Sequence, residues 1–275
     1  MDNPAAEPDL NPSSLPGDEV PTSTSPPVSF HPDQIDPAAA HAERRRLWIE
    51  IFAILSVGVV PHLIHGISSF VGAQPQAAGV QWNAPNFFLS LGVGAIPSIA
   101  CGLFIAWSSR EHPSTFGFVR PKPAWDIVLV VAALVGAYAS WWAYSASVGY
   151  YMQLFGTTPT VNDSITTSMV PPASLSDHML FVASYVLNAA GEEIVLWAVL
   201  FTRVEKLLRV PVLDVLIVAC VFASYHIYQG VFACGAIAFH GLVVGLLFRT
   251  TRRILPLIIA HATWDLILFY SYMTP

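Results

Sequence analysis

The sequence AAGEEIVLW places two adjacent carboxylates, Glu192 and Glu193, inside a stretch that is otherwise apolar. A carboxylate that is shielded from water keeps its proton to higher pH and can act as a general base near neutral pH. Other apolar stretches contain His226, His261 and Asp265. Two imidazoles and a carboxylate can position water and stabilise an oxyanion, or can bind a divalent metal ion. Together these residue types favour a hydrolytic site.

The elements that carry these residues are predicted to be membrane-spanning helices. Hydrophobic residues make up 54% of the 275 residues and charged residues only 11%, and the mean hydropathy is +0.57. An ordinary soluble domain has about a quarter of its residues charged, so lipid must solvate most of this surface. The predicted fold class is therefore all-α, a polytopic bundle of about seven spans. The apolar runs lie at about 47–69, 85–107, 126–150, 178–201, 212–229, 232–248 and 254–272.

The basic residues predict the orientation of these spans. All twelve Lys and Arg lie before the first run or in every second connection, so an odd number of spans puts them on one side. The positive-inside rule identifies that side as the cytoplasm. The N-terminus is then cytoplasmic, and we expect a multi-pass protein of the plasma membrane of a bacterial cell.

The ionisable side chains are predicted to lie at one depth in the membrane. Measured from the cytoplasmic flank at about 1.5 Å per helical residue, Glu192, His226, His261 and Asp265 lie about 16, 18, 12 and 18 Å deep. His261 and Asp265 also share a helix face, because they are four residues apart. Three helices can therefore direct these four side chains into one polar site.

Two other functions can place such residues inside a membrane. Polar side chains can hold helices together by hydrogen bonds, although ionisable residues within spans are costly and functional by default. Ion-coupled transporters use buried Asp, Glu and His as proton relays, but this sequence has neither a visible repeat nor paired broken helices. The matched depth of four residues favours an active site over both.

Three motifs resemble those of the CPBP family of intramembrane proteases, which includes the CAAX prenyl endopeptidases. GEEIVLW, FASYH and HATWD resemble the family's EExxxR, FxxxH and HxxxN or HxxxD, in the same order and on three of the last four helices. The flanking YHIYQG and GLLFRTTRRILPLIIAHATWDL are also similar to the family. The resemblance covers residues 115–272, with the motif-bearing core at 178–272.

The resemblance implies an endopeptidase that hydrolyses a peptide bond of a membrane-associated protein. Glu192, with Glu193 beside it, would activate the attacking water. His226 and His261 would be its partners at the reacting centre, and Asp265 would occupy the family's Asn/Asp position. Zinc or another divalent metal is a possible cofactor, and the residues leave open a metallo- or a glutamate-dependent mechanism. Its candidate ligands are Glu192, His226, His261 and Asp265.

One position departs from the family pattern. Trp197 stands where the first motif has Arg. An Arg four residues after Glu193 could compensate its charge, whereas Trp cannot, so Glu193 must be protonated or paired elsewhere, with His240 as a candidate partner. The alternative to a protease is therefore a non-catalytic, CPBP-like binding or regulatory protein.

The remaining features bear on organisation and partners. Residues 1–42 are acidic and rich in Pro and Ser, and we interpret them as a disordered cytoplasmic tail ahead of a transmembrane protease domain at 43–275. Several acidic residues precede the first Lys or Arg, so nucleic acid is not expected as a partner. The expected partners are the lipid bilayer and a membrane-associated protein or peptide. His62 and His65 are predicted to be interfacial.

Two further predictions concern charged residues at helix ends. RVEKLLR, residues 203–209, is predicted to be an amphipathic segment on the cytoplasmic surface. Asp126 and Asp214 precede apolar runs and are predicted to be helix N-caps.

Overall fold

The computed structural model describes residues 36–71, 83–156 and 170–273. The chain divides into two units, residues 1–40 and 41–275, and the second carries all three motifs. Most of the predicted tail lies outside the described residues. Residues 37–42, however, are helical and form the start of α1 (Pro37–Gly58).

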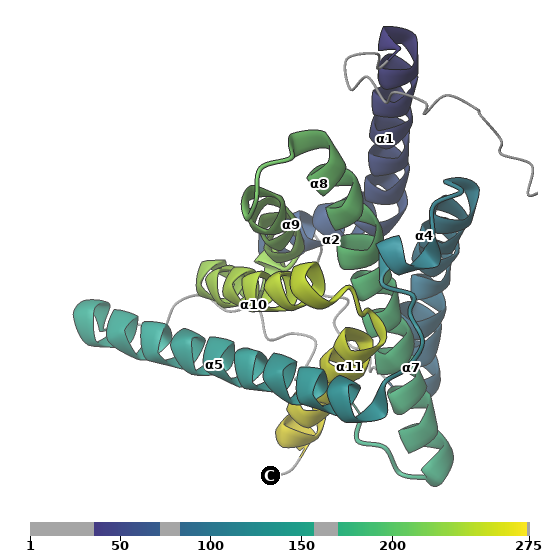
Figure 1. The fold of residues 1–275 in the computed structure, drawn as a ribbon. Helices are drawn as coiled ribbons and strands as arrows, with labels where there is room; N and C mark the ends of the chain where they lie inside the picture. Colours follow the sequence, from purple (N-terminus) through teal and green to yellow (C-terminus); the bar gives the residue numbers. More distant parts are fainter. Residues whose placement is uncertain (1–35, 72–82, 157–169, 274–275) are drawn as a thin grey trace, which may run out of the picture. The chain divides into compact units, whose positions relative to one another are not determined.

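Every regular element in the described ranges is a helix, which confirms the predicted all-α class. Figure 1 shows α10 alongside α5, and both α5 and α7 pack against α11. Beyond α1, the elements are α2 (Val60–Phe70), α3 (Ala84–Phe87), η1 (Phe88–Gly92), η2 (Val93–Ala95), α4 (Ile96–Ser108), η3 (Pro113–Phe116), α5 (Pro123–Phe155), α7 (Leu175–Glu193), η4 (Ile194–Phe201), α8 (Thr202–Leu208), α9 (Leu213–Ser224), η5 (Ile227–Gln229), α10 (Val231–Thr251) and α11 (Leu255–Met273).

Helices occupy each of the seven predicted spans, but they differ in length. Among the described residues, four stretches are long and apolar enough to cross a membrane: 84–108, 123–155, 175–208 and 231–251. α1 and α2 are bent by 44° against each other, as in a broken span or a re-entrant loop, and α9 and α11 are shorter. The polytopic class is confirmed, and the number of seven spans stays a prediction.

The π-helix η4 lies at the centre of the packed unit. All eight of its residues are buried. Glycines of three neighbouring helices let the backbones approach it closely: a Cβ on Gly58, Gly102 or Gly245 would come within 2.7 Å of a side chain of η4. Small residues of this kind are typical of helix contacts in membranes. The helix that carries Glu192 and Glu193 is therefore held by α1, α4 and α10.

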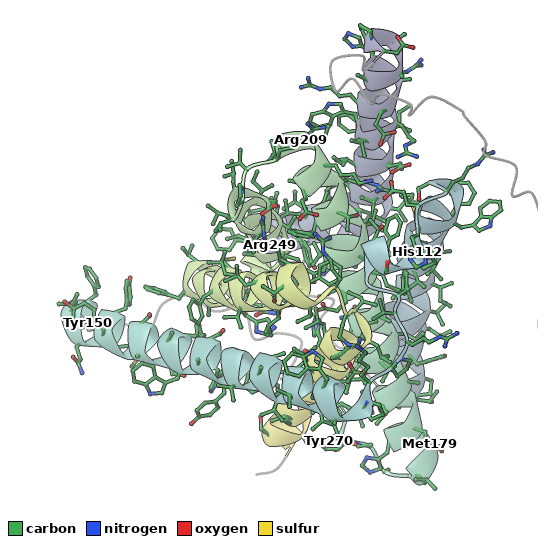
Figure 2. All side chains as sticks on the ribbon, viewed as in Figure 1. His112, Tyr150, Met179, Arg209, Arg249 and Tyr270 are labelled. Atoms are coloured by element: carbon green, nitrogen blue, oxygen red, sulfur yellow. The ribbon has the colours of Figure 1, made fainter. Side chains whose placement is uncertain are left out.

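α5 is packed along only part of its 33 residues. Its buried residues lie on one face, at spacings of three or four apart from the adjacent Gly136 and Ala137, and end at Ser140. Figure 2 shows Tyr150, near the end of α5, well separated from Tyr270 of α11. Only the first half of α5 thus supports the motif-bearing helices.

Ion pairs tie the ends of several helices together. Arg253 Nε lies 2.5 Å from Asp126 Oδ1, and Arg249 Nη1 lies 2.6 Å from Asp214 Oδ1. Both aspartates lie within the first turns of α5 and α9 rather than before them. The prediction that they are N-caps is therefore wrong, since their main partners are Arg249 in the last turn of α10 and Arg253 just after it.

A second group of charges, which we call the ion-paired cluster, joins α1, the residue Glu111 after α4, and α8. Arg203 Nε lies 2.5 Å from Glu50 Oε2, and its Nη1 lies 2.9 Å from Glu111 Oε1. Lys206 Nζ and Arg46 Nη2 approach Glu111 at 2.7 and 3.1 Å. The side chain of Arg203 has no exposed area. The prediction that residues 203–209 lie on the surface is thus wrong at Arg203, because two carboxylates hold it inside.

Candidate active site

The first motif sits at the junction of an α-helix and a π-helix. α7 begins with a capping box, in which the Ser174 hydroxyl accepts from the Asp177 backbone and the Asp177 carboxylate accepts from that of Ser174. It runs to Glu193, where η4 begins without a break. Glu192 and Glu193 are therefore the last residues before a widened turn, a geometry often found at functional sites.

The third motif supplies the partner of both glutamates. His261 Nδ1 lies 2.8 Å from Glu193 Oε1, and its Nε2 lies 3.6 Å from Glu192 Oε2. Asp265, one turn further along α11, places Oδ2 3.7 Å from the same Nε2. We call these four residues the carboxylate-rich cluster, because three carboxylates surround one imidazole.

The second motif brings His226 to the same place. His226 follows the end of α9, and its Nδ1 donates to the Phe222 carbonyl at 2.9 Å. The Phe222 ring lies against both imidazoles, with its centroid 5.0 Å from that of His226 and 6.1 Å from that of His261. The structure thus brings together all five residues that the sequence singled out.

Two carboxylate oxygens in this cluster have no hydrogen-bond partner. Glu192 Oε1 accepts a bond of 3.3 Å from Asn188 Nδ2, but Glu192 Oε2 is buried without one, and so is Glu193 Oε2. Buried acceptors of this kind are costly unless water or a ligand satisfies them. Glu192 Oε2 is therefore available to a water molecule.

The same side chains do not form a ready metal site. Within the described ranges, no group of three or more His, Cys, Asp and Glu side chains is arranged to hold a metal ion. The Nδ1 atoms of His226 and His261 are engaged by the Phe222 carbonyl and by Glu193, which leaves only Nε2 of each ring.

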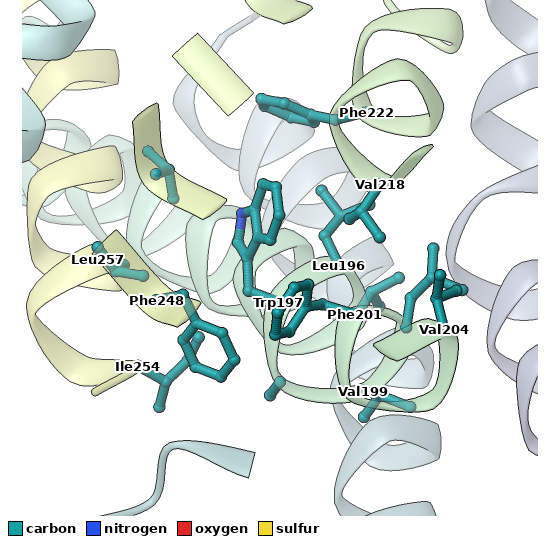
Figure 3. Packing of buried hydrophobic residues seen from close by; sticks show 14 of the residues in the cluster. Leu196, Trp197, Val199, Phe201, Val204, Val218, Phe222, Phe248, Ile254 and Leu257 are labelled. Atoms are coloured by element: carbon teal, nitrogen blue, oxygen red, sulfur yellow. The ribbon is translucent and has the colours of Figure 1, made fainter. Parts of the chain in front are cut away.

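Trp197 lies in the apolar core. The i→i+5 hydrogen bonds of η4 turn the residue four positions after Glu193 in a different direction from the one it would have in an α-helix. Trp197 is 1% exposed and packs against Val215 and the backbone of Gly245. Figure 3 shows its indole inside the apolar cluster, next to Phe222 and Phe248. The position of the family's Arg is thus part of the core, and His261 is the partner of Glu193.

His240 does not provide that partner. Its Nδ1 is buried and has no hydrogen-bond partner among the described residues, while Glu193 Oε1 is bound to His261. The sequence left two alternatives for Glu193, a protonated carboxyl or a partner other than residue 197. The structure supports the second, with His261 as the partner instead of His240.

Several residues near the site were not identified from the sequence. The ring of His62 in α2 lies 5.8 Å from that of Tyr225, so this residue, predicted to be interfacial, contacts the turn that carries His226. Gly66 allows this contact, since a Cβ there would meet the Tyr225 carbonyl oxygen at 2.6 Å. The rings of Tyr225 and Tyr228 both lie against that of His226, with centroids 4.5 and 6.0 Å away. Both tyrosines are in the segment YHIYQG. Their position one residue before and two residues after His226 is the only feature of the sequence that indicates they are near the site.

The fold and the site define an all-helical, multi-pass membrane protein with a buried Glu–His–Asp cluster built from three motifs. Residues 174–267 match the family described as Type II CAAX prenyl endopeptidase Rce1-like. This match contains all three motifs and confirms the resemblance to the CPBP family. It supports an intramembrane protease of the CAAX type, acting on a membrane-associated protein. Neither the curated proteins nor the solved structures contain a match to the chain.

Proposed function

We propose that this protein is an intramembrane endopeptidase in which Glu192 activates a water molecule to cleave a peptide bond of a membrane-associated protein. The observation that carries the proposal is the meeting of side chains from α7, from the turn after α9 and from α11 near Glu192, one oxygen of which has no hydrogen-bond partner. An unpaired acceptor beside imidazoles is suited to bind and deprotonate water.

The reaction follows from the placement of these groups. A water molecule bound to Glu192 Oε2 gives its proton to the carboxylate while its oxygen attacks the carbonyl carbon of the substrate. The carbonyl oxygen becomes an oxyanion. As this intermediate collapses, the C–N bond breaks and Glu192 returns the proton to the leaving nitrogen. The products are a new carboxyl terminus and a new amino terminus.

The other residues of the site position this base. Glu193 fixes the ring of His261 through Nδ1, so that Nε2 faces Glu192 and Asp265. The Phe222 carbonyl orients His226 in the same way, and its Nε2 carries the lone pair of the neutral ring. His226 Nε2 can therefore accept the second hydrogen of the water.

The test is a comparison of membrane-protein termini by mass spectrometry in cells that express the wild-type chain or Glu192→Gln at equal levels. Gln keeps the size of the side chain but cannot accept a proton. The control is Glu43→Gln, at an exposed carboxylate of α1.

We expect new termini in the wild-type and Glu43→Gln cells that are absent from the Glu192→Gln cells. These termini would also identify the substrate. The same set of termini in all three, with the variants folded, would overturn the proposal and indicate a non-catalytic protein.

A further inference from the structure

Glu192 has to hold one particular oxygen toward the water that it activates. The last torsion of a glutamate side chain has only a broad preference, so a carboxylate without contacts has no fixed direction. The two oxygens of Glu192 differ in their contacts. Oε1 accepts a hydrogen bond of 3.3 Å from Asn188 Nδ2, whereas no hydrogen bond from a described residue reaches Oε2. The bond to Oε1 therefore limits the rotation of the carboxylate and leaves Oε2 for water.

The amide of Asn188 does not serve to join helices. Asn188 lies in α7, within a stretch that is long and apolar enough to cross a membrane. A polar side chain in such a helix usually bonds to a neighbouring helix and holds the two together. Among the described residues, however, the one hydrogen bond of the Asn188 side chain goes to Glu192, four residues later on the same helix. The polar contact of Asn188 is thus made to the proposed base itself.

Contacts between α7 and α11 place Asn188 beside the carboxylate-rich cluster. Glu193 lies 2.8 Å from His261 of α11. About two turns earlier on α7, Tyr185 contacts Phe269, which lies about two turns later on α11, with ring centroids 5.6 Å apart. The two helices therefore run antiparallel here, and Asn188 lies between these two contacts. The amide is thus a neutral donor in the same layer of the bundle as the cluster.

The hydrogen bond from Asn188 orients Glu192 without competing for its proton. The contact between Glu192 and His261 is made by Oε2, which lies 3.6 Å from Nε2. This distance is too long for a hydrogen bond, so Oε2 lies beside the imidazole without being occupied by it. A side-chain amide does not titrate near neutral pH. Asn188 therefore neither supplies nor withdraws the proton that the reaction moves.

We propose that Asn188 is a positioning residue, whose side-chain amide holds Glu192 Oε1 so that Oε2 directs the attacking water at the substrate carbonyl. In this role Asn188 acts through Glu192 and takes no part in the bonds that are made and broken. Oε2 takes the proton from the water and returns it to the leaving nitrogen, while Oε1 stays bound to the amide. This inference rests on the proposed function of the site.

The experiment uses the full chain in liposomes and an internally quenched peptide that spans the Glu192-dependent terminus found in cells. Asn188→Leu keeps the approximate size of the side chain but removes the donor, and Asn188→Gln restores an amide on a chain one methylene longer. The matched control is Asn86→Leu, at an exposed asparagine of α3. Thermal unfolding of each variant in detergent shows whether it is folded as the wild type is.

We expect Asn188→Leu to lower kcat about 10- to 10²-fold with little change in KM, because the base is misdirected while substrate binding is unaffected. Asn188→Gln should recover part of this loss, and Asn86→Leu should leave kcat unchanged. The unfolding temperature of Asn188→Leu should not fall, since no bond between helices is lost.

A kcat for Asn188→Leu within about threefold of the wild type, with Glu192→Gln inactive, would overturn this inference and leave the proposed function standing. A decrease in kcat that accompanies a lower unfolding temperature, and that Asn188→Gln does not reverse, would overturn it as well, because a purely structural role gives this result. If no terminus depends on Glu192, both fall together.

Discussion

Two groups of carboxylates are buried beside the two ends of η4, one at its junction with α7 and one around Arg203 at the start of α8. In the ion-paired cluster, Arg203, Lys206 and Arg46 surround Glu50 and Glu111. In the carboxylate-rich cluster, one imidazole serves three carboxylates. The whole of η4 separates Glu192 from Arg203, and the two clusters share no residue.

The comparison separates structural from functional burial of charge. In the ion-paired cluster, each carboxylate is within 3 Å of a cation, and the group links three segments of the chain. In the carboxylate-rich cluster, acids outnumber their partners, and the nearest imidazole nitrogen to Glu192 Oε2 is 3.6 Å away. Burying carboxylates without enough partners is unfavourable in free energy. Proteins retain such arrangements at functional sites and compensate with stabilising contacts elsewhere in the fold.

The largest effect on stability is expected for Trp197→Arg, which restores the family's motif letter. The guanidinium would enter the apolar cluster between α9 and α10 rather than approach Glu193. Loss of a buried Trp and burial of an unpaired charge should cost on the order of 5 kcal/mol or more. Thermal unfolding of the purified protein in detergent measures this. A more stable Arg variant would show that the carboxylate-rich cluster lacks a cation.

Arg203→Met should have the next largest effect. Met keeps an apolar stem of similar length but leaves Glu50 and Glu111 without their shared partner. Breaking a buried ion pair in this way costs about 3–5 kcal/mol. Arg45→Met, at an exposed neighbour in α1, is the control and should be almost neutral. Equal unfolding temperatures for the two variants would show that the ion-paired cluster does not stabilise the fold.

A smaller effect is expected from acid. Burial raises the pKa of Glu111, but its hydrogen bond to Lys206 and the charges of Arg203, Lys206 and Arg46 outweigh this and hold the pKa below its ordinary value of 4.5. The stabilisation by Glu111 is therefore complete above pH 4.5 and is lost as pH falls through the lower, folded-state pKa. Unfolding temperatures measured between neutral and acid pH should fall less steeply for Glu111→Gln than for Glu43→Gln.

Glu193→Gln should change stability least. The amide oxygen still accepts from His261 Nδ1, and one of three crowded charges is removed, so stability should change by no more than about 1 kcal/mol. Cleavage should nevertheless decrease, because His261 loses the charged partner that orients it. A loss of stability as large as that of Arg203→Met would mean that the two clusters are built alike.

The general architecture followed from the sequence because lipid imposes simple rules. Long apolar runs predicted every helical stretch that carries a motif, and the helical spacing of His261 and Asp265 predicted their common face. The length of the fourth run was underestimated, since Arg203 reads as a charge at a membrane edge. Only its partners Glu50 and Glu111, distant in the sequence, explain why the helix continues through it to Leu208.

The site was predicted in its members but not in its connections. The motifs named the five side chains that the structure brings together. The sequence could not show that His261 binds Glu193, because the direction of Trp197 depends on a π-helix and no apolar pattern distinguishes this from an α-helix. It also could not show the approach of His62, since the bend between α1 and α2 depends on packing against Tyr225.

The π-helix also changes how this chain should be aligned with its relatives. Column-by-column alignment assumes that equal spacing along the chain means equal direction in space. Ile194–Phe201 forms wider turns, so this assumption fails after Glu193. Each following side chain points in a different direction from the one it would have in an α-helix. A residue that pairs with Glu193 therefore has to be sought in space rather than four positions along the chain. In this protein it is His261, which comes from α11 and belongs to the third motif.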